Sequence, residues 1–256
     1  MKIKAMYYVA LMVAVVAMLV TSMPVHASTM DDRIESSAMK SYVFKTYLKD
    51  DDIKIESKDG VVTLTGIVVN EFHKSLAQET LAGLPGVKSV DNRLELKGAP
   101  PTANSDAWLR DKVKVTLLFH RSVSAGNTEV DVKDGIVTLR GPATSRAQKE
   151  LTTEYAKDVD GVKDVNNEMT VTKTSEKTRT VGEKIDDASI TAQVKMTLLF
   201  HRSTSALNTK VETKLGVVTL SGKAKNAAEK NLVTKLVNDV TGVKSVKNQM
   251  TTEKSK

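Results

Sequence analysis

Val61-Val62-Thr63-Leu64-Thr65-Gly66 decides the fold, because the chain repeats this stretch twice. It returns as Ile136-Val137-Thr138-Leu139-Arg140-Gly141 and again as Val217-Val218-Thr219-Leu220-Ser221-Gly222. A second motif, Gly-Val-Lys-x-Val-x-Asn, keeps the same offsets and begins at Gly86, Gly161 and Gly242. Self-similarity at a fixed period is the signature of a repeat architecture. The sequence therefore predicts three copies of one unit, at residues 31–97, 106–172 and 187–252.

Each repeat is expected to contain a helix, two strands, a second helix and a third strand. The aligned Asp31, Asp106 and Asp187 are suited to cap the first helix, whose apolar positions recur at i, i+4 and i+8. Asp59-Gly60 and Asp134-Gly135 predict tight hairpin turns, and Leu215-Gly216 takes their place in the third repeat.

The second helix of each repeat has its own start and stop signals. Asn70, Ser145 and Asn226 are expected to cap it, and the glycines of the second motif to end it. The predicted fold class is α+β: three tandem αββαβ domains, each a three-stranded sheet with two helices packed on one face.

Residues 1–27 predict a secretory signal peptide. Lys2 and Lys4 precede an apolar run from Ala5 to Val20, and Val25-His26-Ala27 places small or medium residues at a cleavage site before Ser28. The run has 16 residues, whereas a helix that spans a membrane needs about 20 apolar residues. Cleavage is therefore favoured over an uncleaved anchor. We expect a mature protein in the periplasm, with no transmembrane helix after cleavage.

Two polar segments, 98–105 and 173–185, are typical of linkers. We expect the three repeats to fold separately, with the third repeat free to move relative to the second.

The D-G-x-V-x-L-x-G and G-V-x-x-V-x-N motifs, in an αββαβ unit, resemble the BON domain family. The osmotically inducible periplasmic members of that family carry two such domains, whereas this chain has three, and its third repeat departs from the pattern at Leu215. The resemblance implies osmotic stress induction and a non-catalytic role in the envelope. It also implies binding to phospholipid membrane surfaces, to outer-membrane protein clients as a chaperone-like protein, or to both.

The residues themselves give little material for catalysis. The chain has no cysteine, which excludes a disulfide scaffold, a thiol nucleophile and a Cys-ligated metal site. His120 and His201 occupy the same repeat position at the end of a helix with no carboxylate three or four residues away. Favourable interaction with the helix dipole explains such histidines better than metal ligation. We therefore expect no enzyme activity, no cofactor and no metal.

The repeated Leu-Leu-Phe runs leave one question open. Leu117 and Leu198 continue the buried stripe of the first helix. The residues after them either close the core or form an exposed patch: Leu118, Phe119, Leu199 and Phe200. Core closure is favoured, because a small domain needs to bury every apolar group that it has. Trp108, the only tryptophan, is suited to a membrane interface or partner groove if exposed, and packing against a neighbouring repeat is the alternative.

The positive charge is concentrated in the third repeat. Residues 186–256 carry twelve basic and six acidic groups, whereas residues 106–173 carry eleven of each. Lys223, Lys225 and Lys230 surround the start of the second helix, and Trp108 with these lysines is the predicted membrane or partner site. The partner of this site would be an anionic phospholipid surface or an envelope protein client. The alternative is that the lysines form a solvated surface that binds no partner.

An exported nucleic-acid or polyanion-binding protein is the alternative function. The export signal and the balanced charge of the first two repeats count against nucleic acid, because such binding requires concentrated positive charge. The sequence does not decide between lipid and client, nor the arrangement of the repeats or the oligomeric state.

Overall fold

The computed structural model describes residues 25–98, 101–172 and 184–252. The predicted signal peptide lies outside the described residues except for Val25-His26-Ala27, which begin the first helix. No helix within the described residues is both long and apolar enough to cross a membrane.

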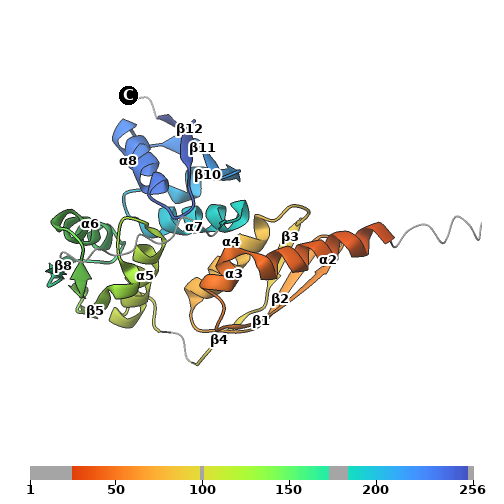
Figure 1. Cartoon of the computed structure of the whole chain (residues 1–256), viewed down its shortest axis with the longest axis horizontal. Coiled ribbons are helices and arrows are strands. Elements are labelled where there is room, and N and C mark those ends of the chain that lie inside the picture. Colours follow the sequence, from red (N-terminus) through yellow and green to blue (C-terminus); the bar gives the residue numbers. More distant parts are fainter. Residues whose placement is uncertain (1–24, 99–100, 173–183, 253–256) are drawn as a thin grey trace, which may run out of the picture.

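Each repeat contains a first helix, a hairpin of two strands, a second helix and a last strand, and repeat 1 adds the short helix α3 (Figure 1). Repeat 1 contains α2 (Val25–Lys40), α3 (Tyr42–Thr46), β1 (Asp52–Lys58), β2 (Val61–Val68), α4 (Glu71–Ala82), β3 (Ser89–Asn92) and β4 (Glu95–Leu96). Repeat 2 contains α5 (Asp106–Phe119), β5 (Glu129–Lys133), β6 (Ile136–Arg140), β7 (Pro142–Ala143), α6 (Arg146–Lys157), β8 (Asp164–Asn167) and β9 (Thr170–Val171). Repeat 3 contains α7 (Asp187–Phe200), β10 (Thr209–Lys214), β11 (Val217–Ala224), α8 (Ala227–Asn238), β12 (Ser245–Asn248) and β13 (Thr251–Thr252).

The sheets confirm the predicted α+β fold. The two hairpin strands pair antiparallel, and the last strand lies parallel to the second. That last strand is interrupted, so β3 and β4 both pair with β2, and β12 and β13 both pair with β11. The helix between the second and last strands provides the crossover that parallel pairing requires.

The hairpin turns form as predicted. Asp59 and Asp134 have φ values of 53° and 54°, each followed by a glycine with positive φ. Leu215 adopts the same left-handed conformation, with φ of 53°, although a leucine is disfavoured there.

The prediction for the start of the first helix was wrong. Ser105 and Asp186 cap α5 and α7, one residue earlier than expected, and α2 begins well before Asp31. The three aligned aspartates hold the hairpin turn instead. Asp106 accepts hydrogen bonds from the main-chain N–H groups of Asp134 (2.7 Å) and Gly135 (2.9 Å), and Asp31 and Asp187 do the same in their repeats.

The second helices begin as predicted but end earlier. The side chains of Asn70, Ser145 and Asn226 accept the capping hydrogen bonds. Their C-caps lie three residues before the predicted glycines, at Gly83, Asp158 and Asp239. This early end leaves a loop that, in repeats 2 and 3, carries an aspartate toward another repeat.

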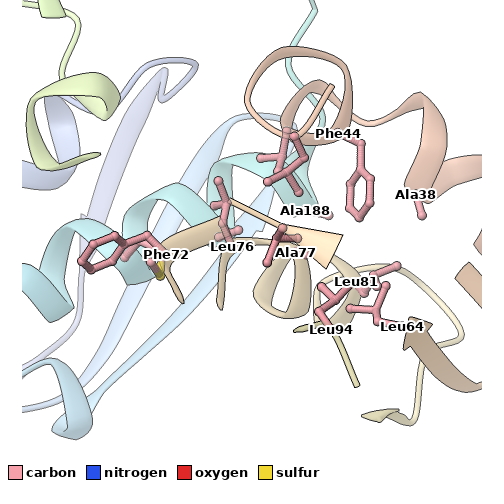
Figure 2. Packing of buried hydrophobic residues seen from close by; sticks show 14 of the residues in the cluster. Ala38, Phe44, Leu64, Phe72, Leu76, Ala77, Leu81, Leu94 and Ala188 are labelled. Atoms are coloured by element: carbon pink, nitrogen blue, oxygen red, sulfur yellow. The ribbon is translucent and has the colours of Figure 1, made fainter. Parts of the chain in front are cut away.

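Each repeat has an apolar cluster of its own, but the cluster of repeat 1 extends into the other two repeats. One apolar cluster combines repeat 1 with Phe119 of α5 and with Ala188, Met196 and Phe200 of α7. Figure 2 shows Ala188 among the α4 side chains Leu76 and Ala77. A Cβ atom added to Gly83 would lie 3.3 Å from Ala188, so α4 ends in close contact with α7.

Repeat 1 also makes polar contacts with repeat 3. Its first helix is broken at Ser41, which frees main-chain N–H groups at the start of α3. The main-chain N–H of Tyr42 donates to the Asp186 carboxylate (2.8 Å), and that of Val43 donates to the Ser189 hydroxyl (3.1 Å). Side chains of repeat 3 thus accept the hydrogen bonds of the N–H groups that the break frees. Repeat 3 is therefore bound to repeat 1 by polar as well as apolar contacts, and is not joined to the rest of the chain by its linker alone.

Candidate functional site

Repeats 2 and 3 dock on each other reciprocally through the segment Leu-Leu-Phe-His-Arg-Ser that both contain. The main-chain N–H of Arg121 donates to Asp239 (3.0 Å), and that of Arg202 donates to Asp158 (2.9 Å). Phe119 and Phe200 accept main-chain hydrogen bonds from the loop after the second helix of the opposite repeat. The same residues thus make the same contacts in both directions, as in a two-fold interface.

The two arginines cap the opposite repeat's second helix. Arg202 donates to the carbonyl groups of Val159 (3.2 Å), Val162 (2.9 Å) and Lys157. Arg121 donates to Val243 (3.1 Å) and Asn238 in the same way. A cation is favourable at a helix C-terminus, where carbonyl groups lack partners within the helix.

His120 and His201 meet at the centre of this interface, where both imidazoles are fully buried. Their Nε2 atoms lie 3.4 Å apart. His201 Nδ1 lies 2.8 Å from Asp158 of repeat 2, and His120 Nδ1 lies 3.3 Å from Asp239 of repeat 3. We call His120 and His201 the histidine pair.

Hydrogen bonds keep the two carboxylates charged. Burial alone would raise the pKa of Asp239, but its contacts with His120, Ser122 and Tyr155 hold that pKa below its ordinary value. Asp158 behaves alike, since His201 and Ser203 lower its pKa against the effect of burial. Burial lowers the pKa of His120, although Asp239 opposes that shift.

The predicted position of these histidines at the ends of helices is confirmed, since His120 and His201 are the C-caps of α5 and α7, but the helix dipole is not their whole environment. Each has a carboxylate partner, but the partner belongs to another repeat and lies far away in sequence, where a search at three or four residues does not reach. Repeat 1 has Lys45 at the histidine position and Gly83 at the aspartate position, so it lacks both halves of this interface.

The residues of the Leu-Leu-Phe runs differ in how far they are buried. Phe119 and Phe200 are buried, as core closure predicted, but the core they close is shared with repeat 1. Leu118 is half-buried against the same cluster, whereas Leu199 is 52% exposed.

Trp108 is half-buried between repeats. Its ring lies 6.0 Å from Phe72 of repeat 1, and the Lys112 ammonium lies 4.7 Å above it. Lys112 is buried and donates to the Asp160 carbonyl (3.0 Å), and burial lowers its pKa. This geometry corresponds to packing against a neighbouring repeat, the alternative to an exposed membrane anchor.

The three predicted lysines lie in two environments. Lys223 and Lys225 are exposed. Lys230 is half-buried and donates to the Met250 carbonyl (2.6 Å), as Lys149 does to Met169 in repeat 2. Lys230 therefore contributes to the fold of repeat 3 as well as to its charge.

Glu229 fixes the loops beside the exposed lysines. It is buried and accepts hydrogen bonds from the main-chain N–H groups of Ser205 (2.5 Å) and Lys225 (2.6 Å). Burial alone would raise its pKa, but these hydrogen bonds hold it below the ordinary value. The loop that contains Leu207, 94% exposed, is thereby held close to Lys225.

The sheet of repeat 3 presents a second group of lysines that charge counting alone did not define. Val211, Val218 and Leu220 face the helices, so the alternate residues of each strand face away from them. We call this outer surface the basic sheet face, and its members are Lys210, Glu212, Lys214, Val217, Thr219, Ser221, Lys223, Ser245, Lys247 and Thr251. Its four lysines are all exposed.

The same positions in the other repeats are not basic. Four lysines and one glutamate give the basic sheet face a net charge of +3. The matching surface of repeat 1 has Lys54 and Lys58 against three carboxylates, and that of repeat 2 has Lys133 and Arg140 against three, so each is −1. Comparing the repeats at alternate strand positions would have identified this surface from the sequence.

Over the part of the chain that the structure covers, no three His, Cys, Asp or Glu side chains are grouped to hold a metal ion. The described fold and sites define a protein of tandem αββαβ domains that are docked on one another.

The chain belongs to the BON domain family, whose model matches residues 30–98, 105–173 and 186–254. It is 33% identical over 143 residues to Osmotically-inducible protein Y of Escherichia coli, covering 54% of this chain and 71% of that protein. It is 29% identical over 145 residues to the outer membrane lipoprotein DolP of Haemophilus influenzae, covering 54% and 75%. A structural protein of the type III secretion system of Chlamydia trachomatis, CdsD, aligns with a TM-score of 0.25 at 17% identity, over 87% of this chain and 91% of that one. The suspected family and its three repeats are thus confirmed.

Proposed function

We propose that this protein is a non-catalytic periplasmic protein of the envelope stress response that adsorbs to anionic phospholipid surfaces through the basic sheet face. The carrying observation is the charge of that face, +3 in repeat 3 against −1 at the matching positions of the other repeats. Near an anionic membrane each lysine contributes about 1 kcal/mol, so four give reversible adsorption. The names of the two relatives, an osmotically inducible protein and an outer membrane lipoprotein, support this setting.

Two exposed leucines flank the basic sheet face. Leu207 precedes β10 and is 94% exposed, and Leu215 follows β10 and is 72% exposed. Repeats 1 and 2 have Asp51 and Gly126 at the first position and aspartates at the second. Apolar side chains at both ends of a basic surface suit the boundary between lipid headgroups and acyl chains.

The face is less suited to nucleic acid, the alternative function. Its ten residues include no aromatic side chain, and proteins that bind single strands without sequence preference stack bases on aromatic rings.

A matched pair of charge reversals tests the proposal in vesicle co-sedimentation. Lys210→Glu with Lys214→Glu changes the basic sheet face, and Lys54→Glu with Lys58→Glu makes the same change at the equivalent positions of repeat 1. We expect the repeat 3 variant to bind anionic vesicles at least about ten-fold more weakly, from about 1 kcal/mol per lysine. The repeat 1 variant should bind nearly as the wild type does.

Equal weakening in both variants would show that net charge alone drives adsorption. Binding of the wild type to zwitterionic vesicles, undiminished by salt, would also contradict the proposal, since screening shortens the Debye length to about 3 Å at 1 M salt. Wild-type protein that ignores vesicles but suppresses aggregation of an unfolded outer-membrane protein would favour protein clients instead.

Export is part of the same proposal and has its own test. The intact mass of protein recovered from the periplasm should correspond to a chain that starts at Ser28. A mature chain that retains Met1 would contradict cleavage after Ala27.

A further inference from the structure

The histidine pair has a geometry that the packing of two repeats does not by itself require. The ring centroids lie 5.6 Å apart and the Nε2 atoms 3.4 Å apart, so the two nitrogens lie between the rings and face each other. On the far side of each ring, Nδ1 faces a carboxylate of the opposite repeat. Four ring nitrogens thus form a line between two negative charges.

Two neutral imidazoles carry only two N–H protons between them. That is too few for a hydrogen bond at each of the three contacts: one between the Nε2 atoms and one from each Nδ1 to its carboxylate. A proton on His201 Nδ1 is donated to Asp158 at 2.8 Å. If His120 then carries its proton on Nδ1, two Nε2 lone pairs face each other; if it carries the proton on Nε2, a lone pair faces Asp239. His120 Nδ1 is in fact buried without an aligned hydrogen bond. One additional proton would satisfy both contacts at once.

A metal ion is a poorer occupant than a proton. Structural zinc sites take four ligands, and the described residues supply two imidazole nitrogens here and no group of three or more ligating side chains. The carboxylates already face the Nδ1 atoms, so they are on the wrong side of the rings to complete such a site.

The charged and titratable groups around the pair come from four elements and their following loops. Tyr155 of α6 stacks on His120, with ring centroids 3.8 Å apart, and donates to Asp239 (2.7 Å). Burial and that hydrogen bond raise the pKa of Tyr155 well above its ordinary value, so it stays neutral. The others are Asp158 and Asp160 after α6, Asp239 after α8, Lys112 and Arg121 of repeat 2, and Arg202 of repeat 3.

We propose that the histidine pair is a proton-binding site that joins repeats 2 and 3 while it holds one shared proton and separates them when it takes up a second. With one extra proton, an Nε2–H donates to the other Nε2 and each Nδ1–H faces a carboxylate. With two, both Nε2 atoms carry hydrogen, and two positive rings face each other at 3.4 Å without water between them.

The sign of the pH dependence follows from burial. Burial lowers the pKa of His120 below its ordinary value of 6.5, so the folded state favours neutral His120. While the shared proton remains between the two Nε2 atoms, this contribution of His120 to stability is complete above that ordinary value. It is lost as the pH falls through the folded-state pKa, where His120 takes up the second proton. The pKa values of Asp158 and Asp239 are lowered as well, so their contribution is lost only at more acidic pH, below 3.8. The repeats should thus separate in mild acid, before the carboxylates are neutralised.

The natural absence of cysteine makes a direct test possible in the full chain. Glu129→Cys and Lys210→Cys place spin labels at equivalent exposed positions, the first on β5 of repeat 2 and the second on β10 of repeat 3. Pulsed electron spin measurements between about pH 8 and about pH 5 then report the distance between the repeats. We expect a narrow distribution at the upper pH and a longer, broader one at the lower pH.

The label pair is then combined with variants of the histidines. His120→Gln with His201→Gln replaces both rings with groups that hydrogen-bond but do not titrate, and it should keep one distribution over the whole range. His73→Gln is the matched control, because His73 also pairs with a carboxylate, Asp51 at 2.6 Å, but inside repeat 1. It should leave the transition unchanged.

Three results would overturn the proposal: a wild-type distance independent of pH, a transition that survives in the glutamine variant, or one that His73→Gln removes. If the glutamine variant fails to dock at any pH, ¹⁵N spectra of the wild-type imidazoles decide the question. A proton shared by the two Nε2 atoms near neutral pH supports the site, and two independent neutral rings refute it.

Discussion

Leu215 occupies a backbone conformation that its side chain disfavours, in a turn where both other repeats have aspartate. A non-glycine residue in the left-handed region costs about 1 kcal/mol, and aspartate tolerates it better because its short side chain bonds locally. The side chain is also 72% exposed, so it gains little from burial. Strain retained at an exposed position is a reason to look for a function there.

Leu215→Asp should therefore stabilise the protein while weakening its attachment to vesicles. We expect about 1 kcal/mol of additional stability in urea unfolding, and less co-sedimentation with anionic vesicles because a negative charge replaces an apolar contact. The reverse change in repeat 2, Asp134→Leu, should cost a similar amount of stability and leave vesicle binding unaltered. Stability lost in Leu215→Asp would contradict the strain.

Two lysines of the predicted site should respond differently to charge reversal. Lys230→Glu removes the hydrogen bond to Met250 and should lower the unfolding free energy by about 1 kcal/mol or more. Lys225→Glu changes an exposed side chain beside the same helix and should leave the melting temperature nearly unchanged. Thermal melts of the two variants measure the difference, and equal melting temperatures would mean that the Lys230 contact contributes nothing.

At the scale of elements, each hairpin depends on a carboxylate from the helix before it. Asp106 accepts two main-chain hydrogen bonds from the turn after β5. The turn therefore forms together with the start of α5, which couples a local strand pair to a helix that lies 28 residues away in the chain.

Asp106→Ala should cost about 1–3 kcal/mol of stability, because two main-chain N–H groups lose their acceptor. Asp111→Ala on the same helix is the control, since that carboxylate contacts only its neighbour Arg110 among the described salt bridges. Chemical denaturation of both variants provides the comparison. A similar small loss in both would indicate that water replaces the Asp106 carboxylate without cost.

The helices and strands can largely be predicted from the sequence, but the contacts that their terminal residues make cannot. Alternation and turn pairs predicted the strands, and helical spacing predicted the helices, because each pattern reflects burial within one repeat. Asp106 was assigned to the wrong role because an aspartate at a helix start satisfies the capping pattern whether or not its carboxylate turns toward another element. The position of Gly161 likewise does not reveal that α6 ends at Lys157, with Asp158 as its C-cap.

At the scale of the whole molecule, stability is shared between repeats. Phe119 of repeat 2 packs edge-to-face on Tyr47 of repeat 1, and Phe72 of repeat 1 packs in the same way on Phe200 of repeat 3. The Lys195–Glu79 ion pair joins the same elements at 2.7 Å. Each of these contacts would be lost if either of the two repeats that it joins were removed.

An excised fragment of residues 104–174 should therefore be much less stable than repeat 2 within the chain. It would expose Val115 and Phe119 and leave His120 without Asp239. Burial of a phenylalanine side chain alone contributes about 1.5–3 kcal/mol. Calorimetry of the full chain should give fewer transitions than repeats, and a fragment that melts as cooperatively and at the same temperature would contradict the shared core.

No pattern in the sequence predicted this sharing. The partners of Phe119 and His120 lie in other repeats, and a single sequence contains no periodicity that links residues across such distances. The same-position comparison of repeats carried a partial signal, since the Leu-Leu-Phe-His-Arg-Ser segment is identical in repeats 2 and 3 and absent from repeat 1. That identity did not reveal that the two segments bind each other's repeats.

The reciprocal docking of repeats 2 and 3 also determines which partner each repeat selects while the chain folds. Three homologous units in one polypeptide invite mispairing, because similar surfaces compete for the same contacts. Repeat 1 lacks both groups of this interface, because Lys45 stands at the position of the histidines and Gly83 at the position of the aspartates. With one unit excluded, two complementary units remain, and each occupies the other's docking segment completely. Within one chain the docking segments of repeats 2 and 3 are therefore both occupied.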